Sequence, residues 1–499
     1  MPVARFAYAA PPSLEDALAL LRAHGAEARV LAGGQSLVPM LAYRLVRPRL
    51  VVDVSRLPLD GLEVANGRLR LGALVRYHQL EDTPLVRGHC PVLAEAAGLV
   101  GNLRVRALGT VGGSLAHADP AAELPMVMTA LDARLTLRSS EGARTVSATE
   151  FFRGPLTTAL APDELLVAVE VPLAPTMGWA VEELSRRAGD FALVAVAAGL
   201  ALDAHGRVED VRVALAGVAD RPVRARAAED ALRGHEPTAE RLAEAARLVR
   251  ETLAPASDAF ASGAYRRVLA GVLTRRALAR AAAQAREVAA RGETAPGAAA
   301  ADPGAGAATR GAPRPAAPPG SRADGHVRFV LNGRVHEVAA RPDETLLALL
   351  RDGLGVFDVK EGCGEGVCGA CTVLLDGRPV SSCLVLARSL EGRAVLTVRG
   401  LVADGALHPL QEAFVRAGAV QCGFCTPGML LTAVAVLARQ PRPSRAELRR
   451  ALEGNLCRCT GYTKILDAIE ACARASAGAG VPCGAGALAG APGRAPADG

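Results

Sequence analysis

The chain has 499 residues, a length that predicts roughly three domains, and half of its residues are hydrophobic. Its formal net charge of +6 comes almost entirely from arginines scattered among Ala, Gly and Pro, and aromatic residues are only 3% of the chain. Because there is no basic stripe and there are few aromatic platforms for bases, we expect no nucleic-acid partner. The longest nearly unbroken apolar run, 191–202, is shorter than the roughly 18 residues of a membrane span, and the N-terminus has no signal pattern. We therefore expect a cytoplasmic protein without a membrane span.

Residues 1–55 alternate strand and helix patterns in the manner of a βαβ unit. A capping pair, Ser13 and Asp16, predicts where the first helix begins. The expected elements are a helix at 14–24, a strand at 28–32, a helix at 37–43 and a strand at 50–54. Arginine- and alanine-rich helices are expected much later, at 238–253 and 262–290.

Two glycine-rich segments carry the first sign of ligand binding. The first is Gly33-Gly34-Gln35-Ser36, directly after a predicted strand, and the second is GTVGGSLAHADP at 109–120. Glycines let backbone N–H groups come close to a ligand, and a following helix presents its positive end. The first segment alone is read more simply as a plain turn, but two such segments could hold both phosphates of a dinucleotide. Neither is the G-x-G-x-x-G of a Rossmann unit.

Eight of the eleven cysteines lie between 362 and 462, in two sets of four. The first set has the plant-type spacing for a [2Fe-2S] cluster and consists of Cys363, Cys368, Cys371 and Cys383. The second set lies in helical surroundings and consists of Cys422, Cys425, Cys457 and Cys459. Its Cys-x2-Cys and Cys-x-Cys pattern would by itself also suit a four-thiolate zinc site. The remaining thiols are expected to pack as small hydrophobes; they are Cys90, Cys472 and Cys483.

Both cysteine sets lie in short predicted elements. Asn332-Gly333 predicts a hairpin between strands at 327–331 and 334–339, and a helix follows at 345–352. Around the second set, helices are expected at 410–417, 429–439, 447–453 and 465–475. Residues 292–325 are rich in Ala, Pro and Gly, a composition typical of a disordered linker that tethers two domains without fixing their geometry.

Here the sequence resembles a known family. The runs AGGQSLVPML at 32–41, GTVGGSLAHADPAAELP at 109–125 and FFRGPLTTALAPDELL at 151–166 resemble the FAD-binding medium subunit of the molybdenum hydroxylases. This family includes xanthine dehydrogenase and aerobic carbon monoxide dehydrogenase. The loops QCGFCTPG at 421–428 and NLCRCTGY at 455–462 resemble those of the family's small subunit. With this resemblance the zinc reading of the second cysteine set becomes a minor alternative.

The resemblance implies an α+β fold class, with a FAD-binding domain of the medium-subunit type, a β-grasp ferredoxin-like domain and a four-helix [2Fe-2S] domain. The linker then joins parts that are separate subunits in related enzymes. The expected boundaries are 1–175 for a two-part FAD-binding domain, 176–290 for the C-terminal domain of the flavoprotein half, 291–325 for the disordered linker, 326–402 for the ferredoxin domain, 403–476 for the helical domain and 477–499 for a disordered tail.

The resemblance also implies which residues bind cofactors. The FAD contacts carried over from the family are Ala32, Gly33, Gly34, Gln35, Ser36, Thr110, Gly112, Gly113, Ser114, Asp119, Glu123, Leu166 and Phe191. Glu123 stands where xanthine dehydrogenases carry Asp, and Glu182 departs from the family's flavin-site Lys. Gln421 corresponds to a glutamine that contacts the molybdenum pterin cofactor of the partner. No side chain is expected to be catalytic, because the chemistry belongs to the cofactors.

The expected function is that of an electron-transfer oxidoreductase component. Electrons would leave a molybdenum-binding large subunit, pass the second and then the first cysteine set to FAD, and continue to an external acceptor in a dimer of heterodimers. The large subunit's substrate stays open among CO, aldehydes, purines and other N-heterocycles, and the acceptor among NAD, quinone, oxygen and other acceptors. The alternatives are a self-sufficient NAD(P)H-dependent flavin iron-sulfur reductase and a zinc-binding assembly module.

Overall fold

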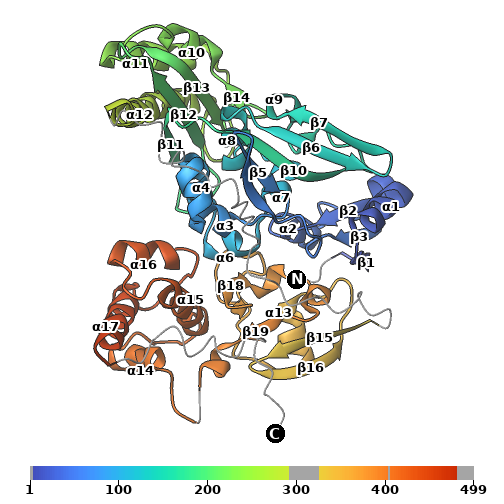
Figure 1. The fold of residues 1–499 in the computed structure, drawn as a ribbon. Helices are drawn as coiled ribbons and strands as arrows, with labels where there is room; N and C mark the ends of the chain where they lie inside the picture. The colour runs from blue at the N-terminus through green and yellow to red at the C-terminus, as the bar shows by residue number, and fades with distance from the viewer. Residues whose placement is uncertain (1–3, 291–324, 403–404, 480–499) are drawn as a thin grey trace.

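The computed structural model describes residues 4–290, 325–402 and 405–479 of the chain. Figure 1 shows two blocks, an N-terminal half (4–290) and a C-terminal half (325–479), which meet where α6 of the first faces β18 of the second. None of the helices in the described ranges is long and apolar enough to cross a membrane. The expected linker at 291–325 lies outside the described residues except for Gly325, as does the expected tail beyond Ala479.

The N-terminal half begins with a small parallel sheet that matches the predicted βαβ pattern. Its strands, in spatial order, are β1 (Ala7–Ala9), β3 (Leu50–Asp53) and β2 (Ala28–Leu31). The prediction for 14–24 is confirmed by α1 (Leu14–His24), where the Ser13 hydroxyl accepts a hydrogen bond from the Asp16 N–H at 3.1 Å. The helix expected at 37–43 is α2 (Leu37–Ala42).

A five-stranded antiparallel sheet follows, with helices packed against it. Its spatial order is β4 (Leu62–Ala65), β5 (Arg68–Gly72), β10 (Leu165–Pro172), β6 (Arg134–Ser139) and β7 (Gly142–Ser147). The helices are α3 (Tyr77–Asp82), α4 (Pro84–His89), α5 (Pro91–Leu99), α6 (Leu103–Leu108), α7 (Val111–His117), α8 (Glu123–Ala130) and α9 (Ala148–Phe151). A short hairpin, β8 (Phe152–Gly154) and β9 (Thr157–Thr158), lies beside them.

The N-terminal half ends in a four-stranded antiparallel sheet covered by helices. The strands are β11 (Gly178–Leu184), β12 (Val194–Leu202), β13 (Val208–Ala216) and β14 (Val223–Arg224). The helices are α10 (Arg226–Leu232), α11 (Ala239–Thr252) and α12 (Gly263–Ala290). β12 is buried almost throughout because α12 covers one side and the core of the preceding domain lies on the other.

The C-terminal half starts with a β-grasp sheet, as the resemblance implied. Its order is β16 (Arg334–Ala339), β15 (His326–Leu331), β19 (Ala394–Leu396), β17 (Thr372–Leu375) and β18 (Arg378–Ser381). The predicted hairpin turn is present, with positive φ at Asn332 and Gly333. The helix expected at 345–352 is shorter than predicted, because after α13 (Leu346–Ala348) the chain widens into a π-helical turn (Leu349–Gly353).

Four helices complete the fold, close to their predicted positions. They are α14 (Pro409–Arg416), α15 (Thr426–Arg439), α16 (Arg445–Leu452) and α17 (Thr463–Ala479). Ser444 caps α16, its hydroxyl accepting from the Glu447 N–H at 3.2 Å, as the capping-box pattern predicts. α17 continues past residue 476, so the expected tail cannot begin at 477. These observations confirm the α+β fold class with its β-grasp and four-helix parts.

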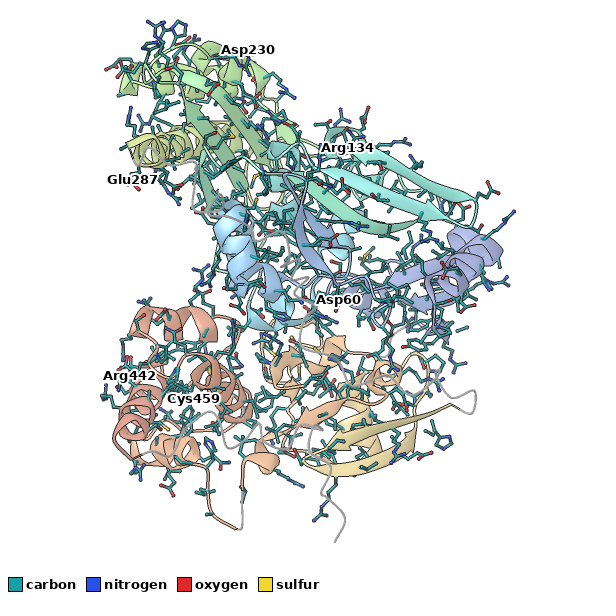
Figure 2. All side chains as sticks on the ribbon, in the orientation of Figure 1. Asp60, Arg134, Asp230, Glu287, Arg442 and Cys459 are labelled. Carbon is teal, nitrogen blue, oxygen red and sulfur yellow. The ribbon has the colours of Figure 1, made fainter. Side chains whose placement is uncertain are left out.

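The two halves share one hydrophobic core. Leu31, Val38 and Leu108 of the N-terminal half are buried in the same cluster as Cys383 and Leu384 of the C-terminal half. Side chains fill the junction below Asp60 in Figure 2. A shared core fixes the mutual geometry of the halves, which a flexible linker alone would leave open.

Candidate cofactor sites

The two glycine-rich segments of the N-terminal half lie against each other. A Cβ added to Gly33 would lie 2.2 Å from the Leu108 carbonyl oxygen, and one added to Gly112 would lie 2.7 Å from the Ala73 Cβ. Thr110 caps α7, its hydroxyl accepting a hydrogen bond from the Gly113 N–H at 3.0 Å. Glycine is therefore needed at these places for close backbone packing, which leaves the loops compact. The Gly112 N–H is itself used in this packing, since it donates to the Ala73 carbonyl at 2.7 Å.

The other predicted flavin residues are spread around these loops. Leu166 is buried in β10, whereas Phe191 is 57% exposed. Glu123 is buried at the start of α8, and burial, helped by the nearby Glu183 carboxylate, raises the pKa of Glu123 to about 8. Glu182, at the position of the family lysine, forms a 2.6 Å ion pair with Arg280 of α12. Asp119 is held locally, its carboxylate accepting from the Ala121 N–H.

The first cysteine set forms what we call the ferredoxin site: Cys363, Cys368, Cys371 and Cys383. Three glycines in its loop have positive φ, namely Gly364, Gly366 and Gly369, so the backbone curls around the thiols. The N–H groups of Glu365 and Cys368 donate to the Cys363 sulfur at 3.3 and 3.4 Å. The Cys371 and Cys383 sulfurs are 3.4 Å apart, and both side chains are buried.

Within each thiol pair of the ferredoxin site, the pKa of one thiol is lowered and that of its partner is raised. The hydrogen bond from the Cys368 thiol, together with backbone N–H groups, lowers the pKa of Cys363 to about 5. The hydrogen bond from the Cys383 thiol lowers the pKa of Cys371 to about 7. Four converging thiols in a loop lined with N–H donors suit a [2Fe-2S] cluster, which takes thiolate ligands and hydrogen bonds to sulfur.

The second cysteine set forms the helical site: Cys422, Cys425, Cys457 and Cys459. The loop before α15 supplies one pair and the loop before α17 supplies the other, and Figure 2 labels Cys459 among these helices. A hydrogen bond to the Cys422 thiol raises the pKa of Cys459. Burial, followed by a hydrogen bond with the Cys457 thiol, raises the pKa of Cys425 to about 12. These pairings place Cys422 beside Cys459 and Cys425 beside Cys457, and Cys422 and Cys459 are exposed.

The two cysteine sites are joined directly through the backbone. The Leu456 N–H, next to Cys457, donates to the carbonyl oxygen of Cys368 at 2.9 Å. Buried Asn455 strengthens this link, its amide donating to the Gly369 carbonyl at 3.3 Å.

A second junction joins the ferredoxin site to the first glycine-rich loop. A Cβ at Gly34 would lie 3.4 Å from the Leu384 carbonyl, one residue after Cys383. Close by, Tyr43 hydrogen-bonds to Glu365 in the cysteine loop, which raises the pKa of Tyr43. The glycine-rich loop, the ferredoxin site and the helical site therefore follow one another in a continuous series of contacts.

The remaining predicted residues are Gln421 and the three cysteines outside the two sets of four. Gln421 is exposed beside Cys422, as a residue at a subunit boundary would be. Cys90 is a buried free thiol, but the expectation of a plain packed thiol is wrong for Cys472, which is disulfide-bonded. Cys483 lies outside the described residues. Sequence reasoning missed the junction residues Arg104 and Asn455, because an arginine in an arginine-rich chain and an asparagine before a cysteine give no local signal.

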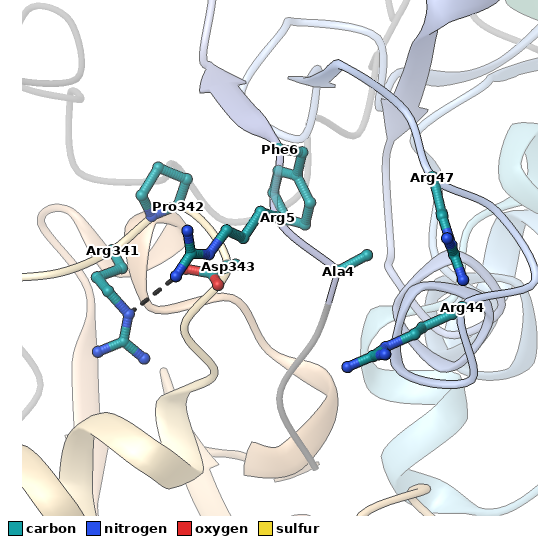
Figure 3. Close-up of a pocket in the computed structure, with 8 residues that line it drawn as sticks. All are labelled: Ala4, Arg5, Phe6, Arg44, Arg47, Arg341, Pro342 and Asp343. Carbon is teal, nitrogen blue, oxygen red and sulfur yellow. Dashed lines mark ion pairs between the residues drawn. The ribbon is translucent and has the colours of Figure 1, made fainter.

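A cavity of about 770 Å³ also lies between the halves, apart from the predicted site residues. It is lined by Ala4, Arg5, Phe6, Arg44, Arg47, Arg341, Pro342 and Asp343 (Figure 3). Arg341 and Asp343 form an ion pair at 3.5 Å, and the other three arginines give the cavity a positive lining. No predicted FAD or cysteine ligand is among these residues.

These observations define the class as a flavin and iron-sulfur protein with two cysteine sites in separate domains. Four family models match in chain order: "FAD binding domain in molybdopterin dehydrogenase" at 4–174, "CO dehydrogenase flavoprotein C-terminal domain" at 179–281, "2Fe-2S iron-sulfur cluster binding domain" at 329–396 and "[2Fe-2S] binding domain" at 397–470. The chain belongs to the molybdenum hydroxylase family, as a medium-subunit type flavoprotein joined to a small-subunit type iron-sulfur protein.

Individual relatives match the two halves separately. The nicotine 6-hydroxylase medium subunit of Paenarthrobacter nicotinovorans is 38% identical over 278 residues, which cover 56% of this chain and 97% of that protein. The small subunit of the same enzyme is 52% identical over 139 residues, or 28% of this chain and 84% of that protein. A solved structure of carbon monoxide dehydrogenase from Hydrogenophaga pseudoflava matches with a TM-score of 0.56 and 38% identity, covering 57% of this chain and 99% of that chain.

These matches confirm several expectations. The chain contains a FAD-binding domain and two [2Fe-2S] domains, and it is an oxidoreductase component. The zinc-binding alternative for the helical site is not supported, because the matching model for 397–470 describes a [2Fe-2S] binding domain.

Proposed function

We propose that this chain carries electrons within a molybdenum hydroxylase. In this proposal a separate large subunit oxidises the substrate at a molybdenum pterin cofactor. The electrons then reach the helical site, continue to the ferredoxin site and FAD, and leave to an external acceptor. Support comes from the relatives, which are named as subunits, and from a solved relative that is described as a Cu,Mo-CO dehydrogenase.

The observation that carries the route is the series of contacts along it. The helical site contacts the ferredoxin site through the Leu456–Cys368 hydrogen bond at 2.9 Å. The ferredoxin site contacts the glycine-rich loop where Leu384 lies against Gly34. These contacts, a hydrogen bond at the first junction and van der Waals packing at the second, support the proposed order of the three sites along the route.

We assign the ligands in accordance with this geometry. The eight cysteines of the two sites hold the clusters, and the glycine-rich loops around Gly33 and Gly112 bind the FAD phosphates. Once bound, the clusters transfer single electrons and the flavin stores two. The residues of this chain exclude water from the ferredoxin site, orient N–H groups toward its sulfurs and hold the flavin loops against it.

The exposed rim of the helical site is the proposed docking surface for the large subunit. Cys422, Cys459 and Gln421 are exposed there, and three large apolar side chains of the two ligand loops are exposed with them. The apolar residues are Val420 at 39%, Phe424 at 46% and Leu456 at 49%. Exposed apolar groups beside a redox site suit a protein partner. By analogy with the subunit relatives, the complete assembly is a dimer of heterodimers.

Metal and flavin analysis of the purified full chain tests this function. We expect about four irons and one FAD per chain, and two distinct [2Fe-2S] EPR signals after dithionite reduction. Zinc in place of iron, with no EPR signal, would contradict the proposal. Rapid bleaching of the flavin by NADH in the absence of any partner would instead support the self-sufficient reductase.

The role of the partner needs a second experiment. The full chain is co-purified with its large subunit, and candidate substrates are added without oxygen. We expect both EPR signals and flavin bleaching in the complex, and neither in the chain alone. Purification of a chain that oxidises substrate without a molybdenum-containing subunit would rule out the proposed division of labour.

A further inference from the structure

Arg104 is a buried cation at the junction of the two halves. It lies on α6 of the N-terminal half, and only 1% of it is exposed. Its guanidinium donates to four acceptors, all of them in the C-terminal half. They are the Ser381 hydroxyl at 2.9 Å, the Asn455 side-chain oxygen at 2.8 Å, the Gly454 carbonyl at 2.6 Å and the Val367 carbonyl at 3.4 Å.

All four acceptors are neutral, and none of the ion pairs among the described residues includes Arg104. Burying a charge without a counter-charge costs several kcal/mol in a typical protein, so such a residue needs an anionic neighbour. Arg106, two residues along the same helix, has one, because it pairs with Glu81 at 3.0 Å. The charge of Arg106 is therefore balanced by a carboxylate, whereas none of the hydrogen-bond acceptors of Arg104 carries a charge.

The anions nearest to Arg104 are the thiols of the ferredoxin site. Burial lowers the pKa of Arg104, while the charges of Cys371, Cys368, Cys383 and Cys363 raise it. Two of its acceptors belong to the same site: Val367 precedes Cys368, and Ser381 is two residues before Cys383. The guanidinium thus lies beside the loop that would hold the cluster.

We propose that Arg104 is the counter-cation of the [2Fe-2S] cluster at the ferredoxin site and that it raises the reduction potential of that cluster. This inference rests on the proposed function, in which the ferredoxin site holds such a cluster. With four thiolates, the cluster is a dianion when both irons are ferric, and one added electron gives it a further negative charge. A buried positive charge in a low dielectric stabilises the more negative state more strongly. The flavoprotein half in this way tunes a cluster held by the other half.

The proposal has a reciprocal consequence for the junction. If docking of Arg104 favours the reduced cluster, reduction of the cluster must strengthen the docking by the same free energy. The two halves then bind each other more tightly when the cluster of the ferredoxin site is reduced. This is the state from which an electron passes to the flavin.

An EPR-monitored redox titration of the full chain tests the charge of Arg104. In Arg104→Gln we expect the ratio of reduced to oxidised ferredoxin site, at a fixed potential, to fall about tenfold, which is about 59 mV for one electron. The midpoint of the helical site should change little. Arg104→Lys should shift the midpoint potential of the ferredoxin site much less than Arg104→Gln does. The lysine retains the positive charge, although it loses the planar set of hydrogen bonds that arginine makes.

Two further variants keep the test decisive. Arg106→Gln combined with Glu81→Gln is the matched control and should leave the midpoint nearly unchanged, because it removes an ion pair whose net charge is zero. If Arg104→Gln does not retain iron, Asn455→Asp is used in its place. The Asn455 side-chain oxygen accepts from Arg104 at 2.8 Å, so a carboxylate there would balance the charge of Arg104 and lower the midpoint.

The outcomes separate this inference from the proposed function. A wild-type chain without any [2Fe-2S] signal would overturn the function and the inference with it. A normal signal whose midpoint is the same in the wild type, Arg104→Gln and Asn455→Asp would overturn the inference alone. An Arg104→Lys variant as shifted as Arg104→Gln would show that the hydrogen bonds, and not the charge, are what matter.

Hydrogen exchange gives a readout that does not depend on the midpoint. In the wild type, the backbone N–H groups of α6, the helix that carries Arg104 to the junction, should exchange more slowly in the dithionite-reduced than in the oxidised chain. In Arg104→Gln this difference should disappear. Equal protection in both redox states of the wild type would contradict the reciprocal coupling.

Discussion

The ferredoxin site lies inside a core that both halves share, whereas the helical site lies at the surface of its own domain. Cys371 and Cys383 are buried and free, and Cys422 and Cys459 are exposed and free. Both sites use four thiols, most of them in loops; Cys383 lies in a short 3-10 helix (Ser382–Leu384), and Cys425 is the residue before α15. One site therefore lies at the contact between the halves, while the other lies at the exposed rim where we propose that a partner subunit docks.

The largest expected effect comes from removing one thiol at each site. Cys383→Ala should lose about two irons, and its melting temperature should fall by several degrees, because the cluster also cross-links the shared core. Cys459→Ala should lose about two irons with little change in melting temperature. Iron analysis and thermal unfolding followed by circular dichroism measure both quantities.

Cys90→Ala is the control for this pair, since Cys90 is buried, free and distant in sequence from both sites. It should keep all of its iron. Equal melting temperatures for Cys383→Ala and Cys459→Ala would show that the shared core does not depend on the ferredoxin site.

A second prediction concerns the first glycine-rich loop, at 33–36, which lies against the ferredoxin site. In Gly33→Ala the new Cβ would lie 2.2 Å from the Leu108 carbonyl, so the loop must move. We expect FAD affinity to fall at least about tenfold, or about 1.4 kcal/mol, with both clusters retained. Flavin absorbance after dialysis measures the loss.

Gly88→Ala is its matched control, because nothing lies within 4 Å of a Cβ added there, in helix α4. It should keep its FAD. A Gly33→Ala protein with a full complement of FAD would remove Gly33 from the predicted flavin site.

A third prediction tests the exposed rim of the helical site. Phe424→Ser should weaken binding of the large subunit by about tenfold, or about 1.4 kcal/mol, because it removes an apolar contact at the rim. Val335→Ser, on strand β16 of the ferredoxin domain, is the control with a similarly exposed apolar side chain. Binding is measured by surface plasmon resonance with the purified partner. Equal weakening by both variants would move the docking surface away from the rim.

The smallest expected effect is a pH dependence at the junction. Burial, together with the charge of Arg378, lowers the pKa of His78 to about 3. Since the folded pKa is below the ordinary value of 6.5, neutral His78 stabilises the fold above pH 6.5, and this stability is lost as the pH falls from 6.5 toward 3. The slope is at most about 1.4 kcal/mol per pH unit for one proton.

Melting temperatures of the wild type and His78→Gln between pH 7 and pH 4 check this window. The variant should lose less stability on acidification than the wild type. His24→Gln, which changes an exposed histidine of α1, is the control and should follow the wild type. Parallel curves of melting temperature against pH for the wild type and His78→Gln would show that protonation of His78 does not contribute to the loss of stability in acid.

Local patterns in the sequence were enough to predict most elements and the family. The capping pair at Ser13 predicted α1 residue for residue, and Asn332-Gly333 predicted the β15–β16 hairpin, because caps and turns depend on residues close together in the chain. The spacing of the cysteines predicted two sets of four for a similar reason, since each ligand loop is short. The cofactor ligands remain predictions from these motifs.

Only the tertiary structure decided how the parts meet. It brought Gly34 against Leu384 and Leu456 against Cys368, and it buried Arg104 of the first half beside the cysteines of the second. Such contacts join residues tens to hundreds of positions apart, and no periodicity, cap or spacing records them. What each half binds is therefore readable from local motifs, whereas the order of the sites and the charge at their junction arise from packing between the halves.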